Sequence, residues 1–301
     1  MLTFSIQDLA NFDDAALRTF LDPRDGGVDA HDLGVALHGS DAALIARATT
    51  SLDAATSERF RDANATHATQ PVIDQARRRV LDVLFWPLVY WNAPDRYEEL
   101  IDGEEIHPAI IDALAVDGRV VCDIGAGTGR FTLPVARRAS RVIAVDAVPA
   151  LLERLECHAA HAGVRNVDVR RGSFTALPVD SESVDLAVAC SSFTPAGPHG
   201  GVHAVREAER ITRRGGTVAI IWPQHPESLE ALGYEHLRFD GDDVRHFRSV
   251  AAAERLCRDF YSERAAEWVR AHQSPDVPFR ILDTSPPNDV CIKRLAATPS
   301  R

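Results

Sequence analysis

The pattern of apolar and polar residues changes character near residue 105 of this 301-residue chain. Beyond that point, short apolar runs alternate with segments in which apolar residues recur at three- and four-residue steps. The runs predict strands at Val120–Ile124, Arg141–Val145, Val167–Arg170, Val184–Ala189 and Thr217–Trp222. The segments between them predict helices at Arg130–Ala139, Pro149–Ala162 and Gly201–Arg213. Repeated strand–helix units of this kind predict a parallel sheet with helices on both faces.

The remainder of the chain is expected to complete this sheet. We predict a helix across Ser249–Ala271 and strands near Pro278–Leu282 and Val290–Leu295, the last of them antiparallel. The predicted fold class is therefore α/β, with a doubly wound, mostly parallel seven-stranded sheet.

The first 95 or so residues lack the alternation of strands and predict short helices separated by turns. A longer helix is expected after Gln70, because apolar residues from Ile73 to Trp91 form one stripe at helical spacing. Pro87 should bend or end this helix. We predict two domains: a helical domain at 1–104 that acts as a lid and shapes a pocket, and a ligand-binding α/β domain at 105–301.

Composition limits the classes of partner. The formal net charge of −11 opposes nucleic acid and anionic membranes. The five cysteines are widely spaced and form no C-x-x-C pair, so we expect reduced thiols, a cytoplasmic location and no metal site. No signal peptide is expected at the N-terminus, and the most apolar stretch, Val80–Trp91, is too short to span a membrane.

A glycine-rich turn follows the first predicted strand, in the stretch VVCDIGAGTGRF at residues 120–131. Glycines at this place let backbone N–H groups approach a ligand, and such turns commonly hold phosphate. Dinucleotide sites use the spacing G-x-G-x-x-G, whereas the spacing here is G-x-G-x-G. Asp123, two residues before the first glycine, would repel a phosphate. A ligand with both an ammonium and a carboxylate suits the turn better.

The stretch resembles motif I of the class I S-adenosylmethionine (SAM)-dependent methyltransferases, a strand followed by D/E-x-G-x-G-x-G. This resemblance implies a Rossmann-like fold and SAM as cofactor, with S-adenosylhomocysteine as product. It also implies that the cofactor is bound by Asp123, Gly125, Ala126, Gly127, Thr128 and Gly129. The resemblance covers about 105–222 well and the first 95 residues hardly at all.

Further cofactor contacts are expected at the ends of the next strands. Asp146, with Ala147, ends the second strand about twenty residues after the first glycine, where an acid accepts ribose hydroxyls. Alternatively, Asp146 caps the helix that starts at Pro149. The family's G-D-x-x-x-L-P stretch reads RGSFTALP here, so the resemblance implies adenine contacts from Ser173 and Phe174. Cys190 and Ser191, at the exit of the fourth strand, complete the predicted cofactor site.

The acceptor site is less defined by the sequence. His199, in the loop after the fourth strand, is the candidate catalytic base because histidine titrates near neutral pH; the alternative is a polar loop or cap residue. Aromatic residues gather just before the α/β domain and could line the acceptor pocket. Arg96 in the same stretch could bind the carboxylate of SAM, because a guanidinium pairs well with a carboxylate. The predicted substrate-binding residues are Tyr90, Trp91, Arg96, Tyr97 and Phe193.

The sequence therefore predicts a SAM-dependent methyltransferase that transfers a methyl group to a small molecule by in-line displacement. A protein or RNA methyltransferase is the first alternative, and a non-catalytic SAM-binding regulatory protein is the second. A nicotinamide oxidoreductase is disfavoured by the glycine spacing and by Asp123. The acceptor, the atom methylated and the oligomeric state are not predicted.

Overall fold

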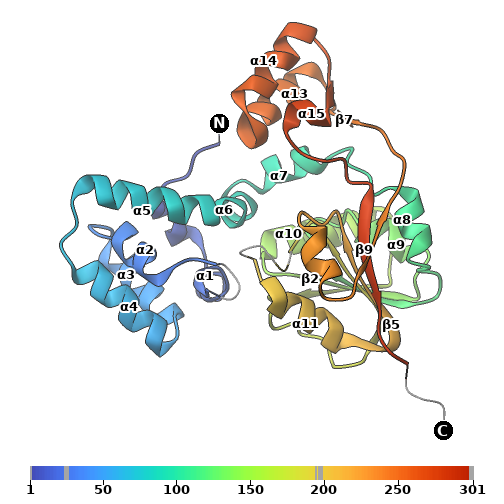
Figure 1. The fold of residues 1–301 in the computed structure, drawn as a ribbon, viewed down its shortest axis with the longest axis horizontal. Coiled ribbons are helices and arrows are strands. Elements are labelled where there is room, and N and C mark those ends of the chain that lie inside the picture. The colour runs from blue at the N-terminus through green and yellow to red at the C-terminus, as the bar shows by residue number, and fades with distance from the viewer. Residues whose placement is uncertain (1, 24–26, 194, 196–198, 298–301) are drawn as a thin grey trace.

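A computed structural model describes residues 2–23, 27–193, 195 and 199–297 of the chain. Figure 1 shows a group of N-terminal helices, a sheet with its covering helices, and a smaller, mainly helical module formed by residues 244–282, here called the C-terminal module. The elements α6 (Phe85–Asn92) and α7 (Pro94–Ile101) run between the three parts. In the described ranges, no helix combines the length and the apolar character that a membrane span requires.

The sheet has seven strands in the order β3-β2-β1-β4-β5-β9-β6. All neighbouring strands from β3 to β5 are parallel, and β9 is antiparallel to both β5 and β6. The predicted seven-stranded, mostly parallel fold with an antiparallel strand near 290–295 is confirmed. The strands of this sheet are β1 (Val120–Ile124), β2 (Arg141–Asp146), β3 (Val167–Arg171), β4 (Val184–Cys190), β5 (Thr212–Ile221), β6 (Glu235–Arg238) and β9 (Asp289–Arg294).

Alternating side chains of the central strands are buried against helices on opposite faces, as a period of two requires. Cys122 and Ile124 pack in the cluster that includes α11, whereas Val121 packs in the cluster that includes α8 and α9. Ala144 packs in a small cluster with the α10 residue Leu155. The helices that cover the sheet are α8 (Pro108–Ala113), α9 (Thr132–Ala136), α10 (Pro149–His161), α11 (Gly201–Ile211) and α12 (Pro226–Glu230).

The prediction of a strand near Pro278–Leu282 is wrong. Phe279–Leu282 forms the helix α15, and only the preceding β8 (Asp276–Pro278) is extended, in a two-stranded antiparallel sheet with β7 (Val244–His246). Phe279 and Leu282 both pack into the core of the C-terminal module, which a helical turn permits and a strand's alternation does not. The seventh strand of the main sheet is instead β6, whose polar sequence EHLR carries little apolar signal.

The single helix expected at Ser249–Ala271 is interrupted. It consists of α13 (Val250–Leu256), a π-helical turn η2 (Cys257–Tyr261) and α14 (Glu263–His272). Ser262 lies between them in extended conformation, and its side chain accepts a hydrogen bond from the Ala265 N–H, which caps α14. The break lets α13 and α14 pack against each other around Leu256, Ala266 and Val269.

The N-terminal region is helical, as expected. Its long apolar stripe divides at Leu84, so Pro87 lies in the first turn of a new helix, where its missing N–H costs little. The helices of this region are η1 (Ile6–Asn11), α1 (Asp14–Leu21), α2 (Ala30–Ala36), α3 (Ala42–Ser51), α4 (Ala54–Ala65), α5 (Gln70–Val83), α6 (Phe85–Asn92) and α7 (Pro94–Ile101).

The N-terminal helices are joined to the sheet domain by both apolar packing and ion pairs. Val148 and Leu151, from the β2–α10 segment, belong to the same buried cluster as the helices. The guanidinium of Arg171 donates to both carboxylate oxygens of Asp13, at 2.7 Å each. Arg154 of α10 pairs with Glu98 of α7. The predicted domain boundary at 104/105 therefore stays a prediction, because apolar packing and ion pairs continue across it.

One buried carboxylate connects three parts of the molecule. Glu104, in the loop after α7, pairs with Arg130 from the glycine-rich turn and with Arg245 from β7. The side chains of Glu104, Arg130 and Arg245 are 7%, 15% and 4% exposed. Arg245 also donates to the Leu100 carbonyl and lies over the ring of Phe247. Because the charges are desolvated, each arginine depends on the carboxylate between them.

Replacing Glu104 tests this connection. Glu104→Gln leaves two buried guanidinium groups without a compensating charge, so we expect the free energy of unfolding to fall by about 3–5 kcal/mol. Urea unfolding followed by circular dichroism measures the change. Glu105→Gln, at the exposed neighbouring position, is the control and should unfold like the parent protein. Equal stability of the two variants would contradict the structural role of Glu104.

Candidate functional site

The glycine-rich turn between β1 and α9 is held in a conformation that only glycine tolerates well. Gly125, Gly127 and Gly129 have φ values of +76°, +54° and +101°. A Cβ on Gly125 would lie 2.5 Å from Ser192 Cβ, and one on Gly129 would collide with a methyl group of Leu155. The backbone of the turn is therefore in close contact with the exit of β4 and with α10.

Asp123 lies at the base of this turn and is buried, with 1% of its surface exposed. Its Oδ2 accepts a hydrogen bond of 2.6 Å from the Thr132 hydroxyl. Its Oδ1 is also buried and has no hydrogen-bond partner among the described residues. Burial raises the pKa of Asp123 to about 7, although the hydrogen bond from Thr132 lowers it. The site therefore contains an unused acceptor that would gain from a cationic or N–H donor.

Asp146, at the end of β2, connects two turns. Its Oδ2 accepts from the Gly127 N–H and its Oδ1 from the Val148 N–H, each at 2.9 Å. Burial raises the pKa of Asp146, while these two hydrogen bonds lower it. Val148 is the N-cap residue of α10 and no side chain caps this helix, so the bond from Val148 makes Asp146 part of a local turn before the helix rather than its cap. Each carboxylate oxygen still has a second lone pair for a ligand hydroxyl.

Phe174 and Phe193 form an aromatic wall beside the turn. Their ring centroids are 5.4 Å apart, and a Cβ on Gly125 would lie 3.2 Å from the Phe174 ring. Ser192 lies on the same side of the turn, where its hydroxyl donates to the Ile124 carbonyl at 2.8 Å and so joins the exit of β4 to the end of β1. Ser173, in contrast, pairs in a local bridge with Ala176, and Ser191 is exposed.

Tyrosines from the N-terminal helices lie on the other side of the turn. The Tyr97 hydroxyl would be 3.0 Å from a Cβ on Gly127, so it approaches that glycine closely. Tyr90 packs edge-on against Tyr97, with ring centroids 4.8 Å apart. Burial raises the pKa of both phenols. Arg130 donates to Cys190 Sγ at 3.4 Å, which brings the exit of β4 to the same place.

Three other predicted residues lie in different surroundings. Trp91 packs edge-on against Phe12, and its indole N–H donates to the Asn11 carbonyl at 2.7 Å, within the N-terminal helices. Arg96 is partly exposed and pairs with Glu99. His199 is half-buried, and burial lowers its pKa below the usual range, which favours the neutral imidazole. The three residues before it, 196–198, lie outside the described parts.

Ser192, Arg130 and Glu104 were not predicted from the sequence. A signal existed for Ser192, which lies next to the predicted Ser191 in the same strand exit. Arg130 follows the glycine motif directly, but its partner Glu104 is 26 residues earlier, and Glu104 reaches a second arginine 141 residues later. No local pattern connects residues at such separations.

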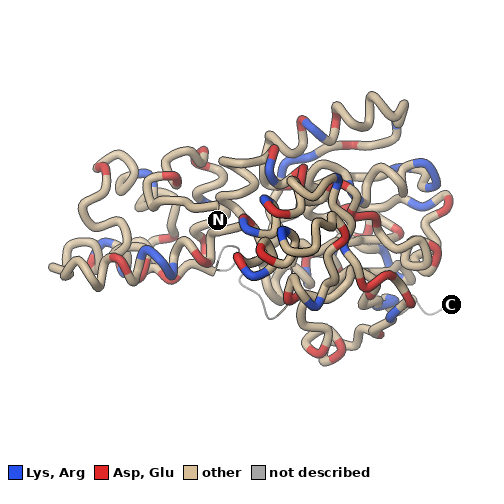
Figure 2. The backbone as a smooth tube through the Cα atoms, turned by 90° about the horizontal axis from the view of Figure 1, so that it is seen from above, with Lys and Arg blue, Asp and Glu red and all other residues tan. Residues whose placement is uncertain are grey.

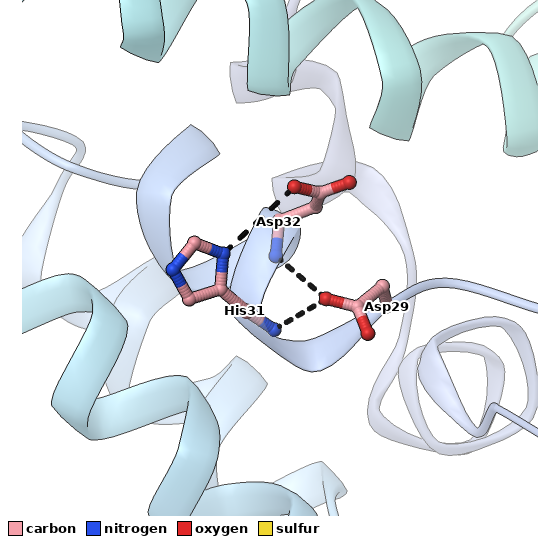
Figure 3. A group of neighbouring side chains, drawn as sticks. All are labelled: Asp29, His31 and Asp32. Atoms are coloured by element: carbon pink, nitrogen blue, oxygen red, sulfur yellow. Dashed lines mark hydrogen bonds and ion pairs between the residues drawn. The ribbon is translucent and has the colours of Figure 1, made fainter.

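Away from this site, three side chains lie close enough together to hold a metal ion: Asp29, His31 and Asp32 (Figure 3). Asp29 Oδ1 accepts hydrogen bonds from the backbone N–H groups of His31 and Asp32, which caps α2. Both oxygens of Asp32 are bonded to Arg79. The group therefore has a structural explanation as a helix cap and an ion pair.

The sheet domain resembles known proteins. Residues 121–216 match a family model described as a methyltransferase domain. An uncharacterized methyltransferase of Mycobacterium tuberculosis is 32% identical over 163 residues, which are 52% of this chain and 62% of that protein. An uncharacterized methyltransferase-like protein of Schizosaccharomyces pombe is 32% identical over 124 residues, 40% of this chain and 44% of that protein. The chain thus spans less than two thirds of these relatives.

Residues 121–216 of the chain thus form a methyltransferase domain, and SAM is the cofactor that such a domain implies. The family predicted from motif I is confirmed. Among solved structures, the YcgJ protein from Bacillus subtilis aligns with 67% of this chain and 99% of its own, at a TM-score of 0.44 and 16% identity.

The raised pKa of Asp123 predicts a pH-dependent stability. Between about pH 4 and pH 7 the folded protein holds a proton on Asp123 that the unfolded chain releases, so stability falls as pH rises through this window. Asp123→Asn cannot titrate. We expect its free energy of unfolding, relative to the parent, to increase by about 2–3 kcal/mol from pH 5 to pH 8.

Urea unfolding at the two pH values measures this difference. The control is Asp180→Asn, at an exposed position, whose stability relative to the parent should not change with pH. A parallel response of Asp123→Asn and Asp180→Asn would show that Asp123 is ionised throughout.

Proposed function

We propose that this protein is a methyltransferase that binds SAM at the β1–α9 turn and methylates a small molecule. The observation that carries the proposal is the buried Oδ1 of Asp123, which has no partner in the described chain and lies at the base of the glycine turn. The ammonium of an amino-acid head supplies the donor that this oxygen lacks. SAM, when bound, supplies an electrophilic methyl group on a sulfonium.

The remaining contacts support a nucleoside next to that head. Asp146 has free lone pairs at the end of β2, where ribose hydroxyls are accepted in folds of this kind. Phe174 and Phe193 offer an aromatic wall on which adenine can pack. The glycines let Ser192, Tyr97 and Leu155 pack directly on the turn, and they leave the backbone N–H groups of the turn without a neighbouring Cβ. In this proposal Ala126, Ala147 and Ser173 contribute backbone contacts.

Methyl transfer requires the acceptor atom to be held in line with the bond that breaks. We assign this positioning to Tyr97, which reaches the turn from α7, and to Tyr90, which packs against the Tyr97 ring. Their phenols stay protonated, because burial raises both pKa values, and so they act as hydrogen-bond donors. His199, kept neutral because burial lowers its pKa, is the candidate to accept a proton from the acceptor.

A small acceptor is favoured over a macromolecule by two features. The chain is acidic, and Figure 2 shows Lys and Arg interspersed with Asp and Glu over the described parts rather than gathered in one stripe. The turn is covered by α7, whose Tyr97 approaches Gly127 closely. A nucleic-acid duplex needs a continuous cationic surface at its site. We assign 1–104 as the lid and 105–301 as the cofactor domain.

Ribose recognition by Asp146 is tested with ligands that differ only in the hydroxyls. Asp146→Ala should weaken SAM binding by at least about tenfold, since hydrogen bonds to a charged group contribute roughly 1.5–3 kcal/mol each. Calorimetry measures the affinity, and Asp180→Ala is the control. The parent protein should prefer adenosine to 2′,3′-dideoxyadenosine, and Asp146→Ala should not. A preference retained by the variant would limit Asp146 to ordering the turn.

The acceptor class is tested by methyl transfer from SAM labelled in the methyl group. The protein is incubated with a cell extract separated into metabolites, RNA and protein, and the label is counted in each fraction. After labelled SAM is removed by chromatography, we expect a labelled product among the metabolites and no such product with Gly127→Val, whose side chain would meet Tyr97. Label in RNA or protein would establish the macromolecular alternative. Tight SAM binding without any transfer would favour a regulatory SAM-binding protein.

A further inference from the structure

A cavity lies at the same edge of the sheet as the glycine turn, but away from the turn itself. It has a volume of about 400 Å³, within the range of small-molecule pockets. It is formed where the chain leaves β5, leaves β6 and enters β9. The residues that line it are Pro223, Gln224, Pro226, Arg238, Phe239, Asp240, Ser285, Pro286, Asn288 and Asp289.

The sheet fixes the distance between this cavity and the exit of β4. Cys190 of β4 pairs with Ile221 of β5, and Ile221 pairs with Val290 of β9. The Trp222 N–H donates to the Asp289 carbonyl at 2.9 Å. Asp289 therefore lies two strand spacings from the β4 exit, roughly 10 Å. A small molecule with a long axis of about 10 Å would span this distance.

Asp289 is a buried carboxylate with an unused acceptor. It is 8% exposed, and its Oδ2 is bonded to His236 Nε2 at 2.8 Å. Its Oδ1 is buried and accepts no hydrogen bond from the described residues. An orphaned buried acceptor is costly and uncommon in native proteins, and here it belongs to a residue that lines an open cavity. A ligand with an N–H donor would satisfy it.

One wall of the cavity offers an aromatic face, while much of the remaining lining is polar. Phe239 is backed by the ring of His107, at 5.8 Å and 18° between planes, and His107 Nε2 is bonded to the Asp240 carbonyl. Three prolines add rigid apolar surface. Ser285 Oγ accepts the indole N–H of Trp222 at 3.2 Å, which fixes the wall nearest β5. Among the charged lining residues, Asp240 and Asp289 outnumber Arg238.

We propose that this cavity binds the amine-bearing end of the methyl acceptor, a small molecule with a ring next to a protonated amine. The inference rests on the proposed methyltransferase function. The ammonium donates to Asp289 Oδ1, the ring packs on Phe239, and the rest of the molecule extends toward the β4 exit. A carboxylate in the same position would meet Asp289 with like charge.

Three compounds of similar shape test the chemistry of the cavity: benzylamine, benzyl alcohol and benzoate. Saturation-transfer NMR and titration on the unmodified full-length protein measure binding. We expect benzylamine to bind, benzyl alcohol to bind more weakly, and benzoate to show no competition with benzylamine. Equal binding of benzoate and benzylamine, or no binding of benzylamine, would overturn the proposal.

Asp289→Asn locates the binding. The variant keeps the shape of the side chain but loses the charge, so the Kd for benzylamine should increase by at least about tenfold. Asp242→Asn, at an exposed position between β6 and β7, is the control and should bind like the parent. Phe239→Leu is a second variant that removes the aromatic wall while Asp289 stays intact. Unchanged benzylamine affinity in both cavity variants would place the amine elsewhere.

Failure of this proposal is distinguishable from failure of the methyltransferase function. SAM affinity of Asp289→Asn, measured by calorimetry, should equal that of the parent, because Asp289 lies two strands away from the exit of β4. Selective benzylamine binding in a protein that does not bind SAM would refute the function and leave the cavity as an amine site. SAM binding without benzylamine binding would refute only the amine site.

Discussion

The close packing around the β1–α9 turn is the constraint on which the rest of the structure depends. Three glycines in left-handed backbone conformations bring the turn against Ser192, Tyr97 and Leu155, each from a different element. A side chain at Gly125 or Gly129 would collide with its neighbours, and one at Gly127 would crowd Tyr97, so the exit of β4, the helix α7 and the helix α10 are all placed relative to one short loop. The proposed cofactor contacts from Phe174 and Asp146 follow from the same packing.

Charge strengthens this arrangement where apolar packing ends. His158 of α10 is bonded to the Thr128 carbonyl at 3.1 Å and to Glu98 of α7 at 3.0 Å, so it joins the turn to its cover. Glu104 joins Arg130, at the end of the turn, to the C-terminal module. The turn is therefore bonded to α7 through His158 and to the C-terminal module through Glu104.

The elements that could be predicted from the sequence are those whose signals are local. The β1 strand, its glycine turn and the acid that ends β2 each depend on residues adjacent in the chain. At Phe279–Leu282 the apolar run favours a strand, but the segment is a helix. The polar edge strand β6 gives no strand signal at all. Tertiary packing decides the structure of both segments. Side-chain partners are harder still: the position of Tyr97 against Gly127 depends on how α7 lies on the turn. The cavity beside Asp289 carries no sequence signal, because it arises where three separate strand ends meet.

The ion pairs of Glu104 also bear on the order in which the chain can fold during synthesis. Glu104 and Arg245 are separated by 141 residues, and Asp13 and Arg171 by 158. A growing chain exposes the whole glycine motif long before it contains the last partner of Glu104. A ribosome-bound intermediate that ends before residue 245 can pair only one of the two carboxylate oxygens of Glu104 with an arginine described here. Arg130, at the end of the glycine turn, therefore shares Glu104 with a second arginine only after the C-terminal module emerges.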